Sequence, residues 1–103
     1  MKFAIFYTQG PAWVQEKSIY EQPADDHDQW AMDLFKAKKL LFAGPFSDDS
    51  GGLVVLDVAD EAEAQAIFSS DPGLHSGIFR ATLHPWYIFL ATDTVIEPAT
   101  AAV

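Results

Sequence analysis

The chain of 103 residues carries six Lys or Arg against fifteen Asp or Glu, which gives a net charge of −9, and 50% of it is hydrophobic. This length and composition indicate one globular domain rather than two separate cores or a disordered chain. The absence of cysteine excludes disulfides, cysteine-based metal sites and a cysteine nucleophile. Any chemistry must therefore come from carboxylate, imidazole and hydroxyl groups.

The distribution of charge and hydropathy narrows the range of partners. The basic cluster Lys36, Lys38 and Lys39 lies in an otherwise acidic sequence, whereas nucleic-acid binding requires a strongly basic patch. No apolar run approaches the roughly 18 residues that a membrane-spanning helix needs, and the N-terminus lacks the pattern of a signal peptide. We therefore expect a cytoplasmic protein that binds neither nucleic acid nor membranes.

The N-terminal part of the chain predicts a strand, a loop and a helix. Residues 3–7 form an unbroken apolar run rich in aromatic side chains, which is typical of a strand. Residues 10–24 contain two prolines and no sustained hydrophobic period, so we expect a long loop there. Asp25 or Asp26 is expected to cap a helix that runs to about Lys39, with acidic residues in its first turn and lysines in its last.

The rest of the chain predicts a hairpin, a second helix and a final strand. Residues 40–43 and 53–58 are apolar runs joined by a polar turn, as in a β-hairpin. Asp60, with Glu63 three residues later, forms the capping box of the second helix. Alternating side chains over residues 78–90 predict the last strand. The order strand, helix, strand, strand, helix, strand is that of the α+β, ferredoxin-like βαββαβ fold with a four-stranded antiparallel sheet.

The same pattern predicts the domain boundary and the assembly. Residues 1–92 hold all predicted elements, and 93–103 form a C-terminal extension, rich in Ala and Thr, that is mobile or docked on a partner. Two helices can cover only one face of a four-stranded sheet, yet the runs 3–7 and 53–56 are apolar on both faces. We therefore expect a homodimer in which the second subunit covers the other face.

His27 is the strongest candidate for catalysis, and Asp71 is a possible partner. Imidazole is the side chain that titrates near neutral pH, and helical spacing places His27 on the apolar face with Trp30 and Ala31. A half-buried structural histidine is the alternative. Asp71, which precedes Pro72, is by itself better explained as an ordinary turn residue after a helix. If the two side chains lie within hydrogen-bond reach, Asp71 would orient and polarise the imidazole of His27.

Other polar residues are weaker candidates. Ser47 and Asp48 belong either to a solvated hairpin turn or to a site that presents a hydroxyl and a carboxylate to a ligand. His84 shares a strand face with Arg80 and Trp86, so it lines an inter-subunit cavity or is a satisfied interface histidine. No two histidines show the spacing of metal ligands, and the chain contains no glycine-rich phosphate loop, nucleophile elbow or haem motif. We therefore expect neither a metal nor a cofactor.

Four segments of the chain, in order, carry a resemblance to a known family: Lys2–Tyr7; His27 followed by Leu40–Phe46; Ser47–Gly52; and Ser70-Asp71-Pro72 before Gly77 and His84-Pro85-Trp86. In these segments the chain resembles the YCII-related (YciI-like) family of the dimeric α+β barrel superfamily. The resemblance implies a ferredoxin-like protomer, a dimer with a shared barrel, and a site centred on His27 and Asp71. The family's usual Arg, a turn before the His, is missing here, where the sequence reads Ala24-Asp25-Asp26.

Two functions fit these observations. The first is an enzyme, a cofactor-independent lyase or isomerase, that performs acid/base chemistry on a small, cyclic or aromatic molecule in a pocket near the dimer interface. His27 would move the proton, Asp71 would orient it, and Ser47, Asp48 and His84 would contact the substrate. The second is a non-catalytic dimeric module that binds a metabolite or a partner protein through the same cavity. The two differ in whether His27 and Asp71 converge in a concave pocket or point into packed core.

Overall fold

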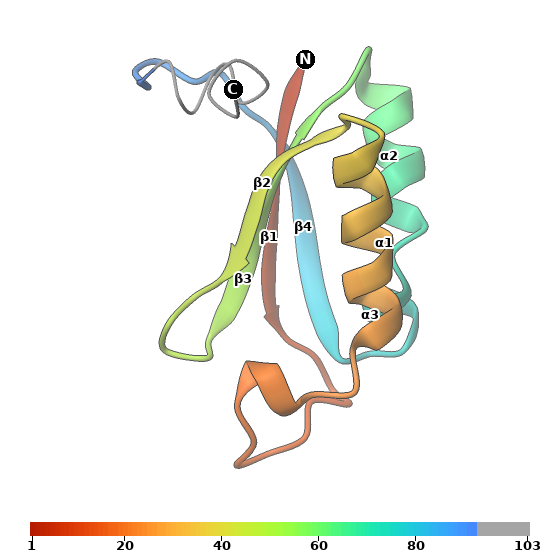
Figure 1. Ribbon diagram of the computed structural model, residues 1–103, viewed down its shortest axis with the longest axis vertical. Helices are drawn as coiled ribbons and strands as arrows, with labels where there is room; N and C mark the ends of the chain where they lie inside the picture. Colours follow the sequence, from red (N-terminus) through yellow and green to blue (C-terminus); the bar gives the residue numbers. More distant parts are fainter. Residues whose placement is uncertain (93–103) are drawn as a thin grey trace.

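A four-stranded antiparallel sheet carries the helices on one of its faces in the computed structural model, which describes residues 1–92 (Figure 1). The strands follow the order β2-β3-β1-β4 across the sheet, and each neighbouring pair is antiparallel. This arrangement confirms the predicted α+β, ferredoxin-like βαββαβ fold. The strand bounds are β1 (Lys2–Gln9), β2 (Leu40–Pro45), β3 (Gly51–Asp57) and β4 (Phe79–Pro85).

The first helix, α1 (Asp25–Lys36), differs from the prediction at both ends. Its N-cap is Ala24, so Asp25 and Asp26 lie inside the first turn, where their charges still favour the helix dipole. The helix ends at Lys36 rather than near Lys39, because Lys38 adopts a left-handed conformation with a φ of 62° that turns the chain into β2. The loop before α1 contains a short 3-10 helix, η1 (Ile19–Glu21), that was not predicted.

The second helix, α2 (Glu61–Ser69), begins largely as the sequence predicts. Asp60 accepts a hydrogen bond from the Glu63 N–H at 2.9 Å, but the Glu63 carboxylate accepts from the Ala59 N–H at 2.8 Å rather than from the cap residue itself. A further short helix, α3 (Pro72–His75), follows where only a turn was expected. Asp71 is the N-cap of α3 and accepts from the Gly73 N–H at 2.8 Å.

The final strand is shorter than predicted, since β4 ends at Pro85 instead of near residue 90. The Trp86 N–H still donates to the Lys2 carbonyl at 2.9 Å, at the residue where β1 begins. The predicted C-terminal extension, 93–103, lies outside the described residues. Within residues 1–92, no helix has the length and apolar character needed to cross a bilayer.

The sheet has a buried face and an outer face. Phe3, Ile5 and Tyr7 of β1 point toward the helices and are at most 3% exposed. They form the core with neighbours that include Val54, Leu56, Ala64 and Phe79. The alternate residues lie on the opposite face, which we call the outer face and which includes Ala4, Phe6, Leu53, Val55, Thr82 and His84. This alternation places the Tyr7 side chain beneath the start of α1, where the candidate site is found.

Candidate active site

Three side chains from distant parts of the chain form one hydrogen-bonded cluster. Nδ1 of His27 lies 2.8 Å from Oδ1 of Asp71. The Tyr7 hydroxyl donates to Oδ2 of the same carboxylate at 2.6 Å. With the Gly73 N–H, the Asp71 carboxylate accepts three hydrogen bonds, and its side chain is fully buried. Such complete pairing is what a buried carboxylate requires.

The His27 ring is held by close contacts on several sides. It stacks on Trp30, with ring centroids 5.5 Å apart and an interplanar angle of 26°, and it also contacts Phe79 at 5.1 Å between centroids. Trp30 Nε1 donates to the Ser70 hydroxyl at 3.0 Å, which ties α1 to the segment that carries Asp71. Gly73 leaves room for the ring, because a Cβ at that position would lie 3.0 Å from Nδ1 of His27.

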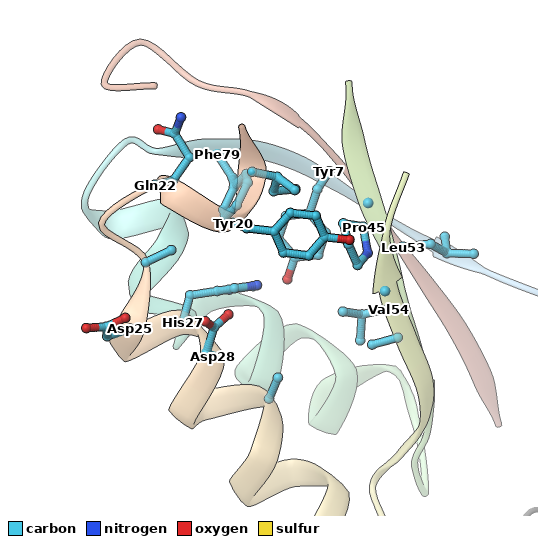
Figure 2. Close-up of a pocket in the computed structure, with 16 residues that line it drawn as sticks. Tyr7, Tyr20, Gln22, Asp25, His27, Asp28, Pro45, Leu53, Val54 and Phe79 are labelled. Carbon is cyan, nitrogen blue, oxygen red and sulfur yellow. The ribbon is translucent and has the colours of Figure 1, made fainter. Parts of the chain in front are cut away.

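The pairing with Asp71 determines which nitrogen of the His27 ring is available to contact a ligand. An ionised Asp71 accepts the hydrogen on Nδ1, so Nε2 is the nitrogen left to accept or donate a proton. Among residues 1–92, Nε2 of His27 has no hydrogen-bond partner, and the His27 side chain is 14% exposed. In Figure 2 the imidazole extends from α1 toward Tyr20 and the strands. The His27 and Asp71 pair therefore presents a free nitrogen at the edge of a cavity.

The cavity has a volume of about 350 Å³ and lies between the start of α1, the η1 loop and the ends of β2 and β3 (Figure 2). Most of its lining is apolar, including Ala31, Val54 and Phe79. Asp25 and Asp28 add two carboxylates at the α1 end, and none of the described lining residues is Lys or Arg. This volume and lining are typical of a site for a small organic molecule.

The other predicted site residues lie away from this cavity. Ser47 and Asp48 belong to the turn between β2 and β3 and do not line it. Hydrogen bonds from the hydroxyl and the N–H of Ser50 hold the pKa of Asp48 below its ordinary value. His84 lies on the outer face, where Nε2 is 2.8 Å from the Thr82 hydroxyl oxygen. Among residues 1–92, no three His, Asp or Glu side chains are grouped to hold a metal ion.

Comparison with known protein families shows which family the chain is similar to. The YCII-related domain matches residues 1–86, which hold all the strands and helices described above. The chain belongs to the YCII-related family. This match confirms the resemblance found in the sequence. Among curated proteins, the uncharacterized protein YjpA from Bacillus subtilis is 29% identical to this YCII-related chain over 80 residues, which cover 78% of the chain and 94% of YjpA.

A solved structure shares the fold of this YCII-related domain. It is 5-chloro-2-hydroxyhydroquinone dehydrochlorinase (TftG) from Burkholderia phenoliruptrix, in complex with 2,5-dihydroxybenzoquinone. The TM-score is 0.59 at 18% sequence identity, and the likeness covers 84% of this chain and 94% of TftG. At this identity the comparison establishes the fold only.

Several residues of the YCII-related site were not predicted. Tyr7 had a signal, since it alternates with Phe3 and Ile5 on a buried strand face, where a hydroxyl needs a hydrogen-bond partner. The wall of the cavity that the η1 loop forms had no such signal in the sequence. It depends on the amide of Gln22, which is 6% exposed, accepts from the Val14 N–H at 2.8 Å and donates to the Val14 carbonyl at 2.9 Å.

Tyr7 should make the stability of the YCII-related domain sensitive to alkaline pH. Burial, followed by the negative charge and hydrogen bond of Asp71, raises the pKa of Tyr7 above its ordinary value. The folded state therefore keeps the proton that the unfolded chain loses above about pH 10, so this stabilisation is present below that pH and is lost above it. We expect the wild type to lose about 1.4 kcal/mol more per pH unit than Tyr7→Phe, measured by urea unfolding above about pH 10.

Tyr20→Phe is the matched control, because the Tyr20 side chain is 82% exposed. This variant should keep the alkaline slope of the wild type. Equal slopes for the wild type and Tyr7→Phe would contradict the assignment of the raised pKa to Tyr7.

Proposed function

We propose that this protein is an enzyme that transfers protons on a small, cyclic or aromatic organic molecule without a cofactor. One observation carries the proposal: Nδ1 of His27 is paired with the buried Asp71, while Nε2 is free at the edge of an apolar cavity. An imidazole oriented by a carboxylate on one nitrogen is suited to general acid/base catalysis through the other. The fold-sharing dehydrochlorinase, an enzyme bound to a small cyclic compound, supports the same class of activity.

In the proposed reaction, a single atom, Nε2 of His27, both accepts and releases the proton. Nε2 of His27 takes a proton from a carbon of the substrate, and the electron pair of the broken C–H bond forms a new double bond. Asp71 stabilises the imidazolium that results. In an isomerase, the π electrons of an adjacent double bond move at the same time to a second carbon of the substrate, and that carbon takes the proton back from Nε2. In a lyase, a leaving group departs with its bonding electrons and the proton is released afterwards.

Deuterium exchange tests the proposal across a set of small candidate substrates. The protein is incubated in D₂O with small lactones and hydroxylated aromatic compounds, and carbon-bound protons are followed by ¹H NMR. We expect the wild type to exchange or transform at least one of these compounds faster than buffer does. Compounds that bind in the cavity but undergo neither exchange nor conversion would instead support the alternative, a metabolite-binding module.

We also propose that the protein is a homodimer that forms through the outer face of the sheet and is located in the cytoplasm. Phe6 is 46% exposed and Trp86 is 40% exposed, although both are large apolar residues. Phe6 contacts Phe46 at 5.5 Å between ring centroids, so the aromatic surface continues past the edge of the outer face. A second copy of the chain would cover this surface. Ligand contacts from Ser47, Asp48 and His84 also remain predictions.

Light scattering at micromolar concentration should give about twice the chain mass of 11.3 kDa. Phe6→Glu should lower it to the mass of one chain, because a carboxylate on the outer face would be buried without a partner. Phe35→Glu is the control, since Phe35 is 57% exposed but belongs to α1. A wild type that is already monomeric, or equal effects of the two variants, would contradict the proposed interface.

A further inference from the structure

The side chains that line the cavity carry an excess of negative charge. His27 and Asp71 form a pair, so even when the imidazole is protonated the pair adds no net positive charge to the site. Asp25 and Asp28 also line the cavity, and neither makes an ion pair with the described residues. No Lys or Arg side chain from the described part of the chain lines the cavity to offset them. A negatively charged ligand would therefore meet no cation and two unpaired carboxylates at the rim of the cavity, of which Asp28 lies beside His27 and Asp25 is turned away from the interior (Figure 2).

The start of α1 does not reverse this balance. The free N–H groups at a helix N-terminus favour an anion. However, the first turn of α1 already holds Asp25, Asp26 and Asp28, whose charges use that favourable potential. A carboxylate on the ligand would be a fourth negative charge beside the same turn. Repulsion of this kind costs affinity even in water, and more where the cavity is partly dry.

The shape and chemistry of the lining favour a ring. Tyr20 is 82% exposed in the free protein, yet it lines the cavity together with Tyr7 and Phe79. In the view of Figure 2 its ring lies between His27 and Pro45. The η1 helix that carries Tyr20 is anchored to the hairpin turn, because Oδ1 of Asp49 accepts from the Ile19 N–H at 3.0 Å. This contact keeps the backbone of η1 beside the cavity, so the ring of Tyr20 is available there as a flat surface for stacking.

From these observations we infer that the cavity selects an uncharged or positively charged ring compound and rejects the same ring when it carries a carboxylate. Tyr20 stacks on the ring, and Asp25 and Asp28 set the charge preference. This inference rests on the proposed function for the position of the site, but it concerns binding and not turnover.

Three probes of one ring test the inference: 4-hydroxybenzyl alcohol, 4-hydroxybenzylamine and 4-hydroxybenzoate, which are neutral, cationic and anionic at pH 7. Their dissociation constants are measured by NMR titration of the ¹⁵N-labelled protein. We expect the benzoate to bind at least about tenfold more weakly than the alcohol, and the amine at least as tightly as the alcohol. Tyr20→Ala should weaken all three by a similar factor, because it removes the shared stacking surface.

Charge-neutral variants identify the residues responsible. Asp25→Asn combined with Asp28→Asn should bring the benzoate to within about threefold of the alcohol, by strengthening the binding of the benzoate far more than it changes that of the alcohol. Asp26→Asn is the control, since Asp26 is in the same turn but does not line the cavity. Equal binding of benzoate and alcohol by the wild type, or an equal effect of Asp26→Asn, would overturn the inference.

The outcome is separable from that of the proposed function. His27→Gln should keep the preference among the three probes, because the substitution leaves Asp25 and Asp28 in place. If the charge preference is found but no compound is transformed, the inference holds and the proposed enzymatic activity fails. If none of the three probes binds at the cavity, the inferred ligand class is wrong, whatever reaction His27 performs.

Discussion

We expect His27→Gln to lower the rate of the deuterium-exchange reaction by at least about 100-fold, the usual contribution of a general acid or base. The glutamine amide can still donate to Asp71, but it cannot carry a proton at neutral pH. The contact with Asp71 is thus preserved in part, and the free energy of unfolding should change by no more than about 1 kcal/mol. Rates and urea unfolding curves of the purified variant measure the two effects separately.

A double-mutant cycle tests whether His27 and Asp71 act as one unit. Asp71→Asn should also lower the rate, because the amide no longer stabilises the imidazolium. The double variant should be scarcely slower than His27→Gln alone, since a residue that acts only through the imidazole then has nothing left to orient. Losses that multiply would mean that Asp71 acts at another point of the reaction.

His75→Gln is the matched control for the histidine substitution. His75 is exposed, with Nε2 2.6 Å from the Ser69 carbonyl oxygen, and does not line the cavity, so the exchange rate should stay within a few-fold of the wild type. If His27→Gln retains its activity per folded molecule but loses several kcal/mol of stability, the imidazole is structural. The binding-module alternative would then be preferred.

The second large effect is on stability, where Asp71→Ala should cost about 3–5 kcal/mol of the free energy of unfolding. The substitution leaves the buried Tyr7 hydroxyl and the Gly73 N–H without their acceptor. It also removes the N-cap of α3 and the partner of His27. Urea denaturation, with the slope of the transition checked for two-state behaviour, gives the difference directly.

Asp60→Ala is the matched control, because Asp60 caps α2 much as Asp71 caps α3 but makes its hydrogen bond in an exposed position. A cap of this kind contributes about 1 kcal/mol. The excess loss in Asp71→Ala therefore measures what burial and the contacts with Tyr7 and His27 add. If the two alanine variants lose the same stability, Asp71 is no more than a helix cap.

The sequence predicts the framework of the site because hydrophobic period is a local property. Alternation places Tyr7 and Phe79 toward the helices, and helical spacing places His27 on the face that packs against them. The order of elements then brings His27 and Asp71 into one region. For Asp71 the two interpretations of the sequence are not exclusive, since the residue both caps α3 and binds His27.

The parts that were not predicted depend on contacts between distant residues. The pattern of residues near Lys38 predicts that the helix continues. The left-handed turn at Lys38 arises instead because the chain reverses there to pair as β2 in the sheet. The η1 loop shows no period, because it is held by the Gln22 amide and by Asp49 of the hairpin turn. Cavity walls built from such contacts carry no signature in a single sequence.

The cluster around Asp71 also has a consequence for folding. Its partners are far away along the chain, with a separation of 64 positions for Tyr7 and Asp71 and of 44 for His27 and Asp71. Contacts that close such long loops carry a large entropic cost and form only when the intervening strands and helices are already assembled. A chain in which α1 or the segment after α2 has not yet docked therefore lacks the His27 and Asp71 pair, and one in which β1 has not docked lacks the contact of Tyr7 with Asp71. During refolding, recovery of the proposed activity should coincide with the last cooperative step. It should not run parallel to the earlier gain of helix or sheet.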